Sequence, residues 1–149
     1  MFGFRRVVKI LAPNVKVKVD TTDSTSFDFA HNKIIIGYDF NDNDDEFGFN
    51  YHLKTAHKCK FADKISNELW TILHELGHYY ANAGIEDEEQ AQFVRSICAI
   101  LGDDIVKGNR EVQAMYYNLP SEWTATEWAI DFIRKNKWKV VFLNFLAKF

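Results

Sequence analysis

Two histidines and a glutamate fall within one short run, His74-Glu75-Leu76-Gly77-His78. On a helix, residues i and i+4 lie on the same face about one turn apart, so His74 and His78 can present two imidazole nitrogens to one ion. Two such nitrogens are half of a tetrahedral zinc site. Glu75 is turned about 100° around the axis from His74, where it can accept a proton from a water on the metal. The run therefore predicts a metal centre with a general base beside it.

The surrounding residues predict a helix over Ser66–Ala83 whose apolar side faces away from both histidines. At about 100° per residue, one stripe contains Leu69, Ile72, Leu73, Leu76 and Tyr80. The histidines share the opposite side with Gly77 and Ala81. Core packing therefore does not explain the histidines, and the two small residues indicate that another element approaches this side closely.

The third ligand has to come from another part of the chain. A metzincin would need Gly at position 81 and His at position 84, but the chain has Ala81 and Gly84, so that class is excluded. Other zincins take a glutamate from a second helix farther along. The candidates are Glu86, Glu88, Glu89, Glu111, Glu122 and Glu127. The first three stand in a charge run at a predicted helix start, where the helix dipole explains them.

Two of these acids lie on one predicted helix, Ser121–Lys135, with Ser121 as its N-cap. Glu127 lies across the axis from Glu122, whose side of the helix also carries Ala125, Thr126, Ala129 and Ile133. Burying a carboxylate on a side of small residues is costly unless a cation meets it, and zinc would be that cation. Glu122 is therefore the preferred ligand and Glu127 the alternative. Stabilisation of the first turn through the helix dipole would also explain Glu122.

Together the two motifs resemble those of the ImmA/IrrE-type gluzincin metallopeptidases, especially the short forms found in phages and in mobile elements of Gram-positive bacteria. The matching residues are His74-Glu75-Leu76-Gly77-His78 and Glu122-x-x-Ala125-Thr126-x-Trp128-Ala129. In that family the second motif typically reads Glu-x-x-Ala-Asn/Asp-x-Phe-Ala, so Thr126 and Trp128 depart from it.

This resemblance, which covers roughly Trp70 to Ile133, implies a zinc ion bound by His74, His78 and Glu122, with Glu75 as general base. It implies a cytoplasmic protease with a protein or peptide substrate, in some members of the family a transcriptional repressor. The alternative hypothesis is a non-catalytic zinc-binding protein, or a phage-encoded protein-interaction factor, with a metallopeptidase-like fold. The intact Glu75 counts against it, because a binding protein has little need of an acid beside the metal.

The elements that must hold the site read as strands first and helices after, which predicts an α+β fold with a small N-terminal antiparallel sheet and a zincin-like helical bundle. Strands are expected within the first 40 residues, at Val15–Val19 and Ile34–Ile36, and Phe27–Phe29 with the polar turn Ala30–Lys33 predicts a hairpin. Helices are expected at Phe49–Lys58, Ser66–Ala83, Glu86–Leu101, Arg110–Tyr117, Ser121–Lys135 and Trp138–Ala147.

Chain length, hydrophobic content and net charge indicate the broad class of protein. With 149 residues, of which 47% are hydrophobic, the chain has the size and apolar content of one domain spanning residues 1–149. The formal net charge of −3 gives no general basic surface, so neither nucleic acid nor an anionic membrane is expected as a partner. The N-terminus lacks the apolar stretch of a secretory signal and nothing approaches a membrane span, so a cytoplasmic location is expected.

A second metal site is not expected. The acidic run Asp39–Glu46 opens like a calcium loop, but Asp44 and Asn50 stand where an EF-hand requires Gly and Glu. His52 and His57 are five residues apart, which places them on different helix faces, so surface or packing roles are expected for them.

Aromatic residues and phenols have two expected roles. Core positions are expected for Trp123, Trp128 and Trp138. A second donor for an oxyanion is needed in peptide hydrolysis, and the candidates are Tyr79, Tyr80, Tyr116, Tyr117, His52 and His57.

The last segment, Lys137–Phe149, is predicted to be an amphipathic helix with basic edges that covers the core or docks on a partner or a second copy.

Overall fold

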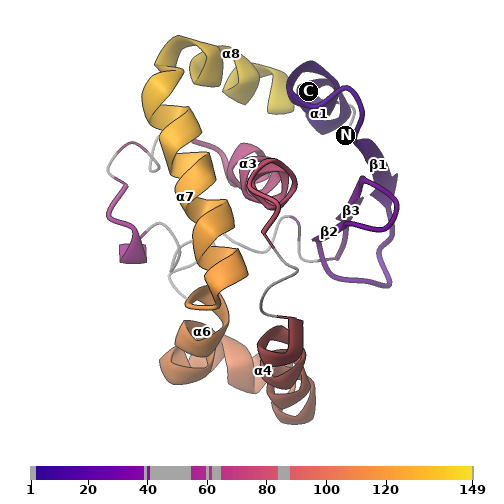
Figure 1. The fold of residues 1–149 in the computed structure, drawn as a ribbon, viewed down its shortest axis with the longest axis vertical. Coiled ribbons are helices and arrows are strands. Elements are labelled where there is room, and N and C mark those ends of the chain that lie inside the picture. The colour runs from indigo at the N-terminus through magenta and orange to yellow at the C-terminus, as the bar shows by residue number, and fades with distance from the viewer. Residues whose placement is uncertain are drawn as a thin grey trace.

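Figure 1 shows the protein as a computed structural model, which describes residues 3–38, 40, 55–59, 61, 65–83 and 88–148. Helix α1 (Gly3–Leu11) precedes the strands β1 (Lys16–Val19), β2 (Ser26–Asp28) and β3 (Lys33–Ile36). The helices that follow are α3 (Asn67–Tyr80), α4 (Glu88–Leu101), α5 (Asp103–Gly108), α6 (Arg110–Tyr117), α7 (Pro120–Lys135) and α8 (Lys137–Ala147). A small sheet followed by helices is the α+β fold expected from the sequence.

The sheet is mixed, with β3 between the other two strands. β2 and β3 pair antiparallel, which confirms the hairpin expected around the turn Ala30–Lys33. β1 pairs parallel to β3, with Val17 opposite Ile34, so the expectation of a wholly antiparallel sheet is wrong. The isoleucines of β3 give the reason: Ile34 and Ile36 are buried, and a central strand buries β-branched side chains best. Because β3 occupies the centre of the sheet, β1 pairs with the edge of β3 that β2 leaves open, and it runs parallel to β3.

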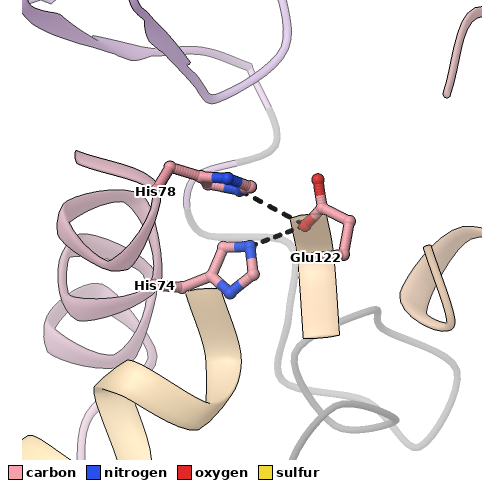
Figure 2. Close-up of side chains that lie close together, drawn as sticks. All are labelled: His74, His78 and Glu122. Carbon is pink, nitrogen blue, oxygen red and sulfur yellow. Dashed lines mark hydrogen bonds and ion pairs between the residues drawn. The ribbon is translucent and has the colours of Figure 1, made fainter. Parts of the chain in front are cut away.

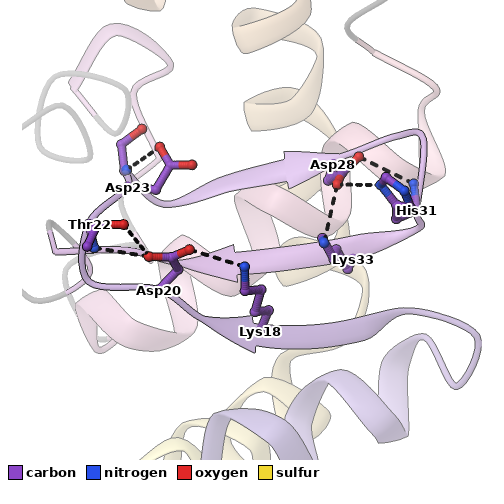
Figure 3. Close-up of polar contacts among 8 residues, drawn as sticks. Lys18, Asp20, Thr22, Asp23, Asp28, His31 and Lys33 are labelled. Carbon is purple, nitrogen blue, oxygen red and sulfur yellow. Dashed lines mark hydrogen bonds and ion pairs between the residues drawn. The ribbon is translucent and has the colours of Figure 1, made fainter.

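Carboxylates hold the turns on either side of β2 (Figure 3). Asp20 accepts hydrogen bonds from the hydroxyl and the backbone N–H of Thr22, at 2.6 and 3.1 Å. The hydroxyl contact is the main reason that the pKa of Asp20 falls to about 2. After β2, Asp28 accepts a hydrogen bond from the backbone N–H of His31 at 3.3 Å and pairs with Lys33 at 3.6 Å. The pair of Asp28 with Lys33 links the end of β2 to β3, whereas the contacts of Asp20 stay within the loop that precedes β2.

Helix α1 corrects the prediction of strands throughout the first 40 residues. Its buried apolar side chains recur at helical spacing, and they are Phe4, Val7 and Val8. Its exposed side carries Arg5, Arg6 and Lys9. The apolar side packs against α3 and α8, which supply the burial that makes a short helix stable.

Helix α3 forms the centre of the molecule, between α7 and the sheet in Figure 1. The hydroxyl of Ser66 caps it by accepting a hydrogen bond from the backbone N–H of Leu69 at 3.3 Å. The predicted apolar stripe is confirmed for Leu69, Ile72, Leu73 and Leu76, which are fully buried, but not for Tyr80, which is 47% exposed. On the other side of the helix, a Cβ on Gly77 would come within 2.3 Å of the carbonyl oxygen of Ala125 on α7. The close approach that the small residues indicated is therefore confirmed at Gly77.

We expect Gly77→Ala to lower the free energy of unfolding by about 3 kcal/mol, because the added methyl group would meet backbone rather than a flexible side chain. Denaturation with urea measures this change. Gly108→Ala is the matched control, since a Cβ there meets nothing within 4 Å and the expected effect is below about 1 kcal/mol. Equal stabilities of the two variants would contradict the close packing of α3 on α7.

The five helices predicted from residue 66 onward are found, with α3 at Asn67–Tyr80 instead of Ser66–Ala83. α6 has the expected bounds, and α7 and α8 begin one residue earlier than expected, at Pro120 and Lys137. α5 was not expected, since six residues are too few to display a helical period in sequence. The predicted helix Phe49–Lys58 and the acidic run Asp39–Glu46 lie largely outside the described residues. Within the ranges that are described, no helix is both long and apolar enough to cross a membrane.

The three tryptophans expected in the core have different surroundings. Trp128 packs against the core and stacks on Tyr80 and Phe132. Trp123 lies partly at the surface, and Trp138 is 88% exposed. The expectation is therefore wrong for Trp123, which is not part of the core cluster, and for Trp138, because only the opposite side of α8 packs against the core.

Candidate metal centre

His74 and His78 on α3 meet Glu122 at the start of α7 (Figure 2). Nε2 of His74 lies 2.7 Å from Oε2 of Glu122, and Nε2 of His78 lies 3.5 Å from the same oxygen. The potential ligand atoms of the three side chains all lie within 4.8 Å of one another, and all three residues are buried. This group could hold a metal ion, and it is the one such group found among the described residues.

The second nitrogen of each imidazole is held by a neighbour, which turns Nε2 towards Glu122. Nδ1 of His78 donates a hydrogen bond to the carbonyl oxygen of Ala83 at 2.8 Å, and because a carbonyl only accepts, the proton belongs on Nδ1. Nδ1 of His74 lies 3.0 Å from the hydroxyl of Thr126. Contacts of this kind orient metal ligands and fix their tautomers. Both histidines are therefore arranged to offer Nε2 to a metal.

Thr126 makes its contact from the position where the ImmA/IrrE motif has Asn or Asp. Its side chain is fully buried, and its hydroxyl reaches Nδ1 of His74 across the interface of α3 and α7. A hydroxyl can accept a hydrogen bond as a carboxylate or amide oxygen does. The departure from the motif therefore keeps a polar partner for His74.

We expect Thr126→Val to weaken metal binding by about 10- to 100-fold, because valine keeps the shape of threonine but offers no partner to His74. Competition with a coloured chelator measures the affinity. Thr124→Val, on the exposed side of the same helix, should bind metal like the parent. If the two variants bound metal equally well, the hydroxyl of Thr126 would have no part in holding His74.

Of the two acids weighed on α7, the fold brings Glu122 to the histidines. Glu127 lies elsewhere: its carboxylate pairs with Nδ1 of His57, and its side chain is 52% exposed. Of the other candidates, Glu86 lies outside the described residues, and the group does not include Glu88, Glu89 or Glu111. Glu122, the acid that the helical wheel favoured, is thus the one that lies beside the histidines.

His78 and Glu122 shift each other's pKa. Burial lowers the pKa of His78, but the charge of Glu122, their hydrogen bond and the charge of Glu75 together raise it to about 9. Burial raises the pKa of Glu122, yet His78 and His74 hold it well below its ordinary range. The buried carboxylates of Glu75 and Glu122 require positive charge at this place, and without a metal the protonated His78 supplies it. A divalent cation would supply that charge in place of the imidazole protons.

A cavity of about 270 Å³ opens beside the group. Its lining comes from β2 and the turns around it, from α3, α4, α6 and from the start of α7. The lining residues that carry reactive or charged groups include Glu75, His78, Arg95, Tyr116 and Glu122. The predicted general base therefore lines the same cavity as two of the potential metal ligands.

No protein family, curated protein or solved structure matches this chain. The likeness to the ImmA/IrrE group therefore remains a prediction that rests on two short motifs. What the fold adds is that the residues of both motifs lie together in space.

Among the candidates for a second donor, Tyr116 is the one that lines the cavity in the described part of the chain. The negative charge of Glu122 and then burial raise the pKa of Tyr116 well above its ordinary value, so its hydroxyl keeps its proton. Other described candidates contact different parts of the fold: Tyr79, Tyr80, Tyr117 and His57. His52 lies outside the described residues. Sequence could not make this choice, because the packing of α6 against α4 and α7 decides where Tyr116 lies.

Two contributors were missed by sequence reasoning. The carbonyl oxygen of Ala83 holds His78, and a backbone group leaves no trace in the pattern of side chains. Arg95 lines the cavity from α4 together with Glu88 and Ala91. Their spacing puts these three residues on one helix face, but nothing in the sequence indicates that this face borders the histidines.

His57 has the packing role that was expected. Its ring packs against that of Trp123 at 35°, with 3.6 Å between ring centroids, and Nδ1 pairs with Glu127. Burial lowers the pKa of His57 more than Glu127 raises it, which favours a neutral ring. No second group of metal-binding side chains occurs among the residues that the structure describes.

Proposed function

We propose that the protein is a zinc-dependent peptidase in which His74, His78 and Glu122 hold the metal. The observation that carries this proposal is the convergence of these buried side chains beside a cavity that Glu75 also lines. Two imidazole nitrogens and one carboxylate are a ligand set of catalytic zinc sites, which keep a further position open. Zinc, when bound, supplies Lewis acidity that acidifies water and polarises a peptide carbonyl.

Glu75 acts as the general base. It is buried, it follows a ligand directly in sequence, and it lines the cavity with His78 and Glu122. Glu75 accepts a proton from the attacking water as the oxygen adds to the carbonyl carbon. It then returns this proton to the amine nitrogen as the carbon–nitrogen bond breaks. Water and the peptide are the only reactants that this sequence consumes.

Tyr116 is proposed to donate a hydrogen bond to the oxyanion that forms at the carbonyl. Its hydroxyl stays protonated, and its side chain lines the cavity. We expect Tyr116→Phe to lower kcat by about 100-fold. Because the hydroxyl also hydrogen-bonds Glu122, the zinc content of the same preparation is measured and kcat is expressed per bound zinc. Tyr117→Phe, which removes the neighbouring phenol from a side chain packed against the core, is the control. Parental activity in Tyr116→Phe would remove this residue from the mechanism.

The substrate is proposed to be an extended peptide segment of an intracellular protein. β2 stands at one edge of the sheet order β1-β3-β2, and its residues Ser26 and Phe27 line the cavity. A peptide can lie along such an edge through main-chain hydrogen bonds. The ImmA/IrrE likeness supports a cytoplasmic location and adds regulatory proteins to the candidate substrates.

The test is to incubate the zinc-loaded protein with a library of unfolded cellular proteins and to identify new N-termini by mass spectrometry. We expect defined cleavages that disappear after treatment with a chelator and return when zinc is restored. Protein that binds zinc in a fixed ratio but produces no new N-termini would favour the non-catalytic interaction factor over the peptidase. Protein that binds no zinc would reject both.

A further inference from the structure

Helix α8 carries a row of exposed apolar side chains. The exposed fractions are 88% for Trp138, 55% for Val141, 55% for Phe142 and 60% for Phe145. Their spacing of i, i+3, i+4 and i+7 places all four within about 100° of one another around the helix. The opposite side of α8 packs into the core through Val140 and Leu143. These four exposed residues are called the α8 ridge below.

Lysines border the α8 ridge on both sides. Around the helix axis, Lys137 and Lys148 fall beyond Val141, and Lys139 falls beyond Phe142. Helix α1 packs against α8, and neither helix contains an acidic residue. The exposed cations that α1 adds to this end of the molecule are Arg5, Arg6 and Lys9.

Two acidic groups that the structure describes near this end have basic neighbours. Asp131, near the end of α7, is paired with Lys135 at 2.9 Å. Glu68 shares a hollow with Lys148 at the far end of α8. The net charge of −3, from which no membrane partner was expected, is an average over the whole chain. The local charge at α1 and α8 is positive, whereas the net charge of the whole chain is negative.

We propose that the α8 ridge binds an anionic lipid surface. Aromatic side chains on one face with lysines along its borders are the pattern of helices that lie in a membrane interface. The rings enter the boundary of the acyl chains, while the lysine side chains extend to the phosphates. A second copy of the same face would bring lysines against lysines. The α8 ridge also protrudes, with Trp138 almost fully exposed, which suits a deformable lipid surface, whereas a protein partner would need a matching groove.

Membrane binding through α8 would leave the metal centre accessible. Glu122 lies at the start of α7, and α8 follows the end of this helix, whose 16 residues span about 24 Å. Figure 1 shows α8 at one end of α7 and α4 with α6 at the other. The lipid-binding proposal thus stands apart from the proposed peptidase function and survives its failure.

The test uses flotation of the full chain with vesicles of phosphatidylcholine and phosphatidylglycerol. We expect the parent to float with these vesicles, and the triple variant Trp138→Ser, Phe142→Ser, Phe145→Ser to lose at least about tenfold in affinity. The matched control is the double variant Phe93→Ser, Ile100→Ser, which removes side chains that are 61% and 85% exposed on α4. It should bind like the parent. Thermal unfolding checks that all three proteins are folded, since the altered positions are exposed.

Three results would overturn the proposal. The first is a parent chain that does not float with the anionic vesicles. The second is equal binding to vesicles of phosphatidylcholine alone, because the lysines would then contribute nothing. The third is a parent that sediments as a dimer, dispersed by the triple variant, since a second copy would then cover the α8 ridge.

Discussion

Replacing Glu75 by glutamine should strongly reduce peptide hydrolysis while leaving the zinc content at that of the parent. Glutamine has nearly the shape of glutamate but cannot accept a proton from water, so we expect kcat to fall by about 100- to 10,000-fold. The residue is buried beside His78, and its isosteric replacement adds no volume to the cavity. Turnover of a cleaved substrate and metal analysis of the same preparation measure the two quantities.

The matched control is Glu89→Gln, which makes the same chemical change at an exposed position on α4. This control should keep both activity and zinc. Full activity in Glu75→Gln would reject its role as general base. Loss of zinc together with activity would place Glu75 among the ligands instead.

Replacing Glu122 by glutamine should weaken zinc binding by more than about 100-fold. The amide oxygen is a poorer ligand than a carboxylate, and the buried group would lose the negative charge that pairs with His74 and His78. The parent should gain about 2.7 kcal/mol in unfolding free energy when free zinc is 100 times the dissociation constant. At the same zinc concentration the variant should gain little, and thermal unfolding with and without zinc measures the difference.

Glu127→Gln is the matched control on the same helix, because Glu127 was the other candidate and pairs with His57 instead. It should keep its affinity for zinc. The reverse result, with zinc retained by Glu122→Gln and lost by Glu127→Gln, would contradict the arrangement in Figure 2. Neither outcome depends on catalysis, so metal binding and peptidase activity are tested separately.

Helical periodicity in the sequence distinguished the two sides of α3 and of α7. The stripe on α3 separated its apolar side from His74 and His78, and the same reasoning on α7 separated Glu122 from Glu127. These predictions succeed because the side of a helix on which a residue lies depends on local geometry alone. The hairpin of β2 and β3 succeeded for the same reason, since its turn joins neighbouring strands.

Errors arose where a partner distant in sequence decides the outcome. α1 was missed because its apolar side is stabilised by α3 and α8, and β1 was assigned the wrong direction because β3 takes the centre of the sheet. Trp138 was expected in the core, yet α8 packs against the rest of the fold with its other side. Burial at these places is a property of pairs of elements, which a pattern along one segment does not contain.

The sequence by itself determined that His74 and His78 share a helix face, that Glu75 lies beside them, and that Glu122 is the better placed acid on its own helix. Only the tertiary structure decided that these helices meet, through the contact of Gly77 with the backbone of Ala125. It also decided which groups complete the site, since Thr126, Tyr116 and the carbonyl of Ala83 reach the histidines or the cavity from other elements. Helical geometry repeats every few residues and can be read locally, whereas the distance between two helices depends on how their whole surfaces pack.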